Sequence, residues 1–109
     1  MKFLLLLCCL ISINVNAQIP KSGTYTYSYC DEEYNKCIEK CKVVIKGVKI
    51  WVYAPPNITL IKEGELFEKG FLAKTDQGKW VILYDGESIK TLKREIPSWL
   101  DFKRRRFWT

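Results

Sequence analysis

The sequence predicts a mainly β protein, a small single domain folded as an antiparallel barrel or sandwich of seven or eight short strands. Residues 24–29 alternate strictly between Thr or Ser and Tyr, which is the period of a strand. Farther along, short apolar segments are separated by turn residues every eight to twelve positions. One short helix is expected, near residues 31–40.

The first 17 residues have the layout of a signal peptide. Lys2 is followed by an apolar stretch over residues 3–15, and Ala17 supplies the small residue expected before a cleavage point. The apolar stretch is too short to cross the roughly 30 Å of hydrocarbon in a bilayer, so no transmembrane segment is expected. We therefore predict a signal peptide at residues 1–17, a single β-rich domain at 18–109, and a secreted or periplasmic location.

The expected helix depends on charge placement. Asp31 can cap a helix, Glu32 and Glu33 would lie in its first turn, and Lys40 would lie near its end, all of which suit the helix dipole.

The other elements are expected to be strands. Lys46 and Gly47 separate two apolar arms and indicate a tight hairpin. The expected strands cover residues 24–29, 42–45, 48–53, 66–74, 79–84, 89–92, 99–102 and 107–108.

The net charge of +6 is unevenly distributed along the chain. Residues 18–89 carry ten Lys or Arg and ten Asp or Glu, whereas residues 90–109 carry seven and two. A basic C-terminal hairpin with aromatic flanks could contact an anionic surface or a polysaccharide. Its candidate contact residues are Lys103, Arg104, Arg105, Arg106 and Trp108. The alternative is a solvated hairpin tip. No nucleic-acid partner is expected for an exported protein.

Cys30, Cys37 and Cys41 follow the signal peptide, and export favours their oxidation. We expect a Cys30–Cys41 disulfide, with Cys30–Cys37 the next choice. Cys37 is then the free cysteine, and an exposed Cys37 could link two chains into a dimer. The cysteine spacing matches no common zinc site and the chain has no His, so no metal or cofactor is expected.

No enzyme is predicted, because a chain without His lacks the common Ser-His and Cys-His arrangements. Glu63, Glu65 and Glu68 offer a carboxylate pair for a small hydrolase, yet they lie beside lysines as solvated charges do. The prediction is a non-catalytic binding or interaction module. A barrel-type carrier of a small apolar ligand is the alternative. Its lining would be aromatic, drawn from Tyr25, Tyr27, Tyr29, Trp51, Tyr53 and Trp80, unless these residues fill the core.

A resemblance to a known group of proteins is found in three segments, which are residues 41–47, 77–82 and 101–109. In these strand and turn patterns the chain resembles small secreted β-rich proteins of the Bacteroidetes type. The resemblance implies a compact exported β-protein and no particular activity.

Overall fold

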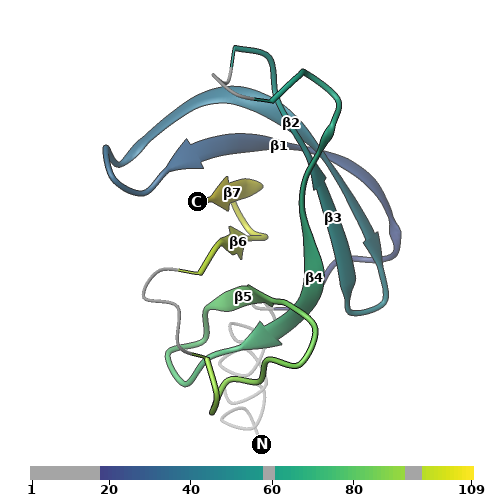
Figure 1. Ribbon diagram of the computed structural model, residues 1–109, viewed down its shortest axis with the longest axis vertical. Coiled ribbons are helices and arrows are strands. Elements are labelled where there is room, and N and C mark those ends of the chain that lie inside the picture. The colour runs from purple at the N-terminus through teal and green to yellow at the C-terminus, as the bar shows by residue number, and fades with distance from the viewer. Residues whose placement is uncertain (1–17, 58–60, 93–96) are drawn as a thin grey trace, which may run out of the picture.

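The computed structural model describes residues 18–57, 61–92 and 97–109, and in these ranges the chain is all β (Figure 1). Seven strands form one closed barrel in which each strand pairs with the next along the chain. They are β1 (Gly23–Asp31), β2 (Lys36–Lys46), β3 (Lys49–Tyr53), β4 (Leu66–Lys74), β5 (Trp80–Leu83), β6 (Trp99–Asp101) and β7 (Arg106–Trp108). The prediction of a small β barrel or sandwich with seven or eight strands is confirmed, and the barrel is the form that the structure has. The signal peptide predicted at residues 1–17 lies outside the described residues.

An odd number of strands determines how the barrel closes. Consecutive strands run antiparallel, so the first and seventh run in the same direction and pair in parallel, with Ser28 opposite Arg106 and Cys30 opposite Trp108. Because β1 and β7 pair with each other, neither strand exposes its backbone edge where they are paired. Within the described ranges, no helix is long and apolar enough to cross a membrane.

The helix predicted near residues 31–40 is wrong, because β2 begins at Lys36 and pairs with β1 from there to Ile45. Asp31 does act as a cap, but of a turn: its Oδ1 accepts hydrogen bonds from the backbone N–H groups of Glu33 and Tyr34. Asn35 then takes a φ of 51°, and the chain reverses. An Asp side chain that accepts these backbone hydrogen bonds can begin either a helix or a tight turn. Here the pairing of β2 with β1 favours the turn.

Most other sequence predictions agree with the structure. Gly47 turns the β2–β3 hairpin with a φ of 62°, and β4 has the predicted bounds. The strand predicted at residues 89–92 is wrong. Instead, the backbone N–H of Thr91 donates to the carbonyl of Ser88, and the two hydroxyls are also hydrogen-bonded. These local hydrogen bonds form a turn in place of the hydrogen bonds between strands that a β-strand would make.

Aromatic and branched side chains fill the barrel interior. The rings of Tyr29, Phe67 and Phe107 contact one another with centroids 5.6 to 6.0 Å apart. Tyr27 is 2% exposed and packs against the same core. Burying each large apolar side chain contributes about 1.5–3 kcal/mol, so this packing is the main source of stability.

Candidate binding site

Five exposed lysines share the outer surface of β2, β3 and β4. Strand alternation puts Lys40, Lys42 and Lys46 outside, because Cys41, Val43 and Ile45 between them are buried. Lys49 and Lys69 face outward from the next two strands. We call this surface the basic face and define it as Lys40, Lys42, Val44, Lys46, Lys49, Trp51, Tyr53, Lys69 and Phe71.

Aromatic rings alternate with the lysines across the strands. Lys42 is opposite Tyr53, and its Nζ lies 4.5 Å from the centroid of that ring. Lys49 is opposite Phe71, with its Nζ 5.8 Å from the ring centroid. Each pair is a cation–π contact that keeps both members at the surface. The basic face is therefore a mosaic of cations and rings.

The charge on this face is not neutralised. Within the described ranges, none of the five lysines lies within ion-pair distance of a carboxylate, and the outward positions that define the face hold no Asp or Glu. Lys46 is directly opposite Lys49 at the end of the hairpin. Like charges placed opposite each other across strands are destabilising, so this pair costs folding energy. An anion bound here would relieve that repulsion.

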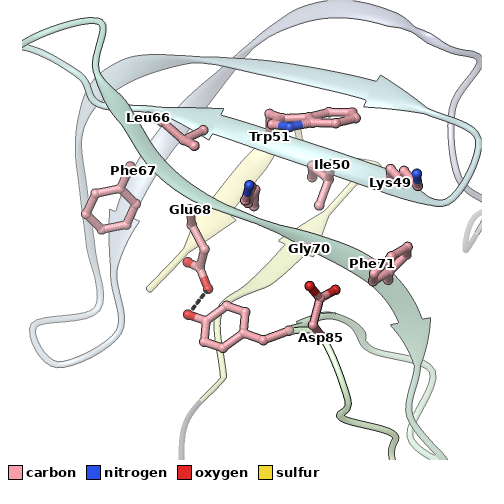
Figure 2. A pocket seen from close by; sticks show the side chains of 11 residues that line it. Lys49, Ile50, Trp51, Leu66, Phe67, Glu68, Gly70, Phe71 and Asp85 are labelled. Atoms are coloured by element: carbon pink, nitrogen blue, oxygen red, sulfur yellow. Dashed lines mark hydrogen bonds between the residues drawn. The ribbon is translucent and has the colours of Figure 1, made fainter.

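A cleft of about 610 Å³ opens into one side of the basic face (Figure 2). Lys49 and Lys69 belong both to the cleft and to the basic face. So do Trp51 and Phe71, which form part of the apolar wall of the cleft. Residues after β5, Tyr84 and Asp85, form the opposite side. The lining includes Lys49, Trp51, Leu66, Lys69, Phe71, Tyr84 and Asp85.

Glu68 is a cleft-lining carboxylate held by two hydroxyls. It is 8% exposed; its Oε2 accepts a 2.7 Å hydrogen bond from the Tyr84 hydroxyl and its Oε1 a 2.6 Å bond from the Ser98 hydroxyl. The Oγ of Ser98 also lies 3.1 Å from Oγ1 of Thr109. Because hydrogen bonds satisfy both oxygens, the carboxylate is a fixed structural element of the cleft.

Of the predicted polyanion-contact residues, Lys103, Arg104 and Arg105 lie in the β6–β7 turn, and Arg106 and Trp108 lie in β7. Arg104 pairs with Asp101 at 3.1 Å, and the guanidinium of Arg105 lies 6.0 Å from the centroid of the Tyr25 ring. Trp108 is buried and stacks on Trp99, with 9° between the ring planes. Of the remaining two predicted residues, Lys103 is exposed and Arg106 is partly buried.

The structure changes the expected cysteine pairing. Cys30 is opposite Cys37 in the strand register and forms the disulfide with it, which was the second choice from sequence. Cys41 is instead opposite Tyr27, where it is buried and free, and burial raises its pKa to about 11. The expectation of a dimer linked through Cys37 is wrong, because the intrachain bond consumes that thiol.

The aromatic residues predicted to line a barrel mouth are divided between two surfaces. Tyr27 and Tyr29 belong to the packed interior, whereas Trp51 and Tyr53 belong to the basic face. Tyr25 and Trp80 pack against the core while partly exposed. Strand alternation separates these sets, and a single aromatic lining does not form.

The three candidate catalytic carboxylates also have separate roles. Glu65 accepts a hydrogen bond from the Lys62 backbone N–H in its own turn, while Glu68 bonds Tyr84 and Ser98. Glu63 is exposed. In the ranges that the structure describes, no group of His, Cys, Asp and Glu is arranged to hold a metal ion.

The chain matches no protein-family model, no curated protein and no solved structure. The resemblance to Bacteroidetes-type secreted proteins therefore stays a prediction, and so does export. What the site can bind has to be argued from the basic face and the cleft.

Proposed function

We propose that this protein is a non-catalytic binding module that binds an anionic polysaccharide on its basic face. One observation supports this most directly: five lysines without carboxylate partners in the described structure share a sheet surface with three aromatic rings. A polyanion that contacts several lysines releases its bound counterions, which drives binding. The rings between the lysines add flat apolar area, as in most ligand sites.

The spacing of the face suits an extended chain of repeated charges. Outward residues recur about every 7 Å along a strand, and neighbouring strands are about 5 Å apart. Trp51 lies along β3 rather than projecting from it (Figure 2), and Trp51 and Tyr53 are both partly buried. Insertion into a bilayer instead needs apolar side chains that project from a surface, so a polysaccharide is favoured over an anionic membrane.

The alternatives have less support. An apolar-ligand carrier needs interior space, and the interior is occupied by Tyr27, Tyr29, Phe107 and their neighbours. A hydrolase needs two cooperating carboxylates, whereas Glu65 and Glu68 belong to different hydrogen-bond networks.

The test is retention on a sulfated, uronic-acid-containing polysaccharide at graded salt. The variant Lys42→Ser/Lys49→Ser/Lys69→Ser removes three charges from the basic face. The matched control Lys103→Ser/Arg104→Ser/Arg105→Ser removes three charges from the β6–β7 turn. We expect the first variant to bind more weakly and to lower the slope of log K against log salt by about 2 to 3, because three cation contacts are lost. The control should bind like the parent protein.

Phe71→Ala separates stacking from charge. It should weaken binding without changing the salt slope, because no cation is removed. Loss of binding in the turn variant alone would contradict the proposed site. Equal retention on anionic vesicles or DNA at the same salt concentration would contradict the assignment to polysaccharide.

A further inference from the structure

The cleft beside the basic face holds charges of both signs. Lys49 and Lys69 line it from β3 and β4, and Asp85 lines it from the turn that follows β5. Figure 2 shows Asp85 on the other side of β4 from Lys49. All three side chains are exposed, and within the described ranges neither lysine pairs with a carboxylate. The cleft therefore offers two cations and an anion to a ligand that enters from solvent.

The two carboxylates of the cleft, Glu68 and Asp85, differ in their partners. Hydrogen bonds from the Tyr84 and Ser98 hydroxyls satisfy both oxygens of Glu68. In the described structure Asp85 has no hydrogen-bond or ion-pair partner, even within its own turn. There it is Glu87 that caps the backbone, with its Oε1 accepting a 2.7 Å hydrogen bond from the Tyr84 N–H. Asp85 is thus the carboxylate that can contact a ligand.

Asp85 restricts the ligands that fit the cleft. A chain with only negative groups would bring one of them towards Asp85, and repulsion between like charges would weaken its binding there. A ligand that suits all three charges has anionic groups for Lys49 and Lys69 and a cationic hydrogen-bond donor for Asp85. An ammonium group supplies that donor, and its charge-assisted hydrogen bond is stronger than one from a neutral hydroxyl.

We propose that the cleft selects an amino sugar of the anionic polysaccharide. The protonated amine of the sugar donates to Asp85, and neighbouring sulfate or uronate groups contact Lys49 and Lys69. The inference rests on the proposed function, because it names the sugar unit that the cleft recognises. The cleft volume of about 610 Å³ lies within the range of about 300–1,000 Å³ that is usual for small-ligand sites. The exposed ring of Phe71 offers a flat apolar surface for the sugar ring.

Two oligosaccharides of equal length and sulfate content test the selection. Both alternate hexosamine with uronic acid, and they differ only in that the hexosamine amine is free in one and acetylated in the other. Calorimetric titration at about pH 6 keeps the free amine protonated. The acetylated form has the larger net negative charge, so attraction to the basic face alone favours it. Recognition by Asp85 favours the free amine instead, and the parent protein should bind that form about two- to fivefold more tightly, as an exposed ion pair allows.

Asp85→Asn removes the carboxylate charge with little change in shape, so it should cancel or reverse the preference for the free amine. The matched control is Asp76→Asn, in the turn between β4 and β5. Asp76 is also exposed, and it lies outside the cleft lining. Both variants change the net charge by the same amount, so a difference between them comes from the position of the carboxylate. The control should keep the parental preference, and thermal unfolding verifies that both variants fold.

The outcomes separate this inference from the proposed function. A parent protein that binds both oligosaccharides without preferring the free amine would overturn the amino-sugar proposal and leave the polysaccharide proposal intact. A preference that Asp85→Asn leaves unchanged would do the same. Binding of neither oligosaccharide would contradict the proposed function, and this inference with it.

Discussion

The hydroxyl of Tyr84 donates a 2.7 Å hydrogen bond to Glu68, and this bond joins the two sides of the cleft (Figure 2). Glu68 belongs to β4, whereas Tyr84 follows β5. Ser98 supplies the second donor to the same carboxylate. The two donors differ in environment, because Ser98 is 5% exposed and Tyr84 is 42% exposed.

That difference predicts unequal costs for removing the two donors. Ser98→Ala leaves one oxygen of a buried carboxylate without its donor, and we expect a loss of about 1.5–3 kcal/mol in the free energy of unfolding. Tyr84→Phe should cost less than about 1 kcal/mol, because water can reach the vacated position. Urea denaturation of both variants measures the difference. A larger loss for Tyr84→Phe would contradict this assignment.

Gly70 permits a close approach between β4 and β5. A Cβ at this position would lie 2.2 Å from the carbonyl oxygen of Leu83, which is backbone and cannot rotate away. Gly70→Ala should therefore destabilise the barrel by more than about 3 kcal/mol or prevent folding, because the strands would have to separate.

The matched control is Gly23→Ala, at the start of β1. The nearest atoms to a Cβ there belong to the Tyr25 side chain, at 3.8 Å or more, so the change should stay within about 0.5 kcal/mol. Thermal unfolding of the two variants provides the measurement. Equal melting temperatures would mean that the close approach at Gly70 is absent.

Local patterns predicted most of the fold but not the β1–β2 turn. Alternation identified the first strand, and Gly47 identified the β2–β3 hairpin. Asp31, Glu32 and Glu33 also satisfy the rules for a helix start, and no local rule separates that outcome from a turn. Pairing with β1 and the Cys30–Cys37 bond decide between them, and both are contacts between strands.

The basic face was missed for a related reason. Positive and negative charges balance over residues 18–89, so charge counted along the chain indicates only the C-terminal basic turn. Alternation of Lys40 and Lys42 with buried residues could have identified one row of the face. Only the register between β2, β3 and β4 shows that Lys49 and Lys69 join this row, while Glu68 points inward.

The cysteine assignment predicts a specific alkylation pattern. Without reductant, peptide mapping should recover Cys30 linked to Cys37, and Cys41 should be alkylated only after unfolding. Burial protects the Cys41 thiol and raises its pKa to about 11, which lowers the thiolate fraction. The variant Cys37→Ser should lose about 2 kcal/mol of stability because the loop between the strands is no longer closed. Rapid labelling of Cys41 in the folded protein would contradict its placement.

Burial raises the pKa of Tyr27, Tyr29 and Cys41, and the fold should therefore weaken at alkaline pH; Tyr27 and Cys41 allow the pH range to be stated. Burial is the main cause that raises the pKa of Tyr27 from 10.0 to about 12 and that of Cys41 from 9.0 to about 11. Both groups are neutral when protonated, and the unfolded chain releases their protons at lower pH than the folded chain does. Stability is therefore complete below about pH 9 and falls as the pH rises from about 9 to about 12. A shift of one unit corresponds to about 1.4 kcal/mol, so the combined loss is a few kcal/mol.

Urea midpoints measured from pH 8 upward test this linkage, and two variants separate its parts. Cys41→Ala should be less stable at neutral pH but should lose less stability between about pH 9 and 11, because it lacks the thiol. Tyr27→Phe should reduce the loss between about pH 10 and 12, because it lacks the Tyr27 hydroxyl, whereas the buried Tyr29 hydroxyl keeps its own contribution. A parental midpoint that stays constant from pH 8 to 12 would show that the barrel protects none of these groups from ionisation. A decline that persists unchanged in both variants would assign the alkaline sensitivity to other groups.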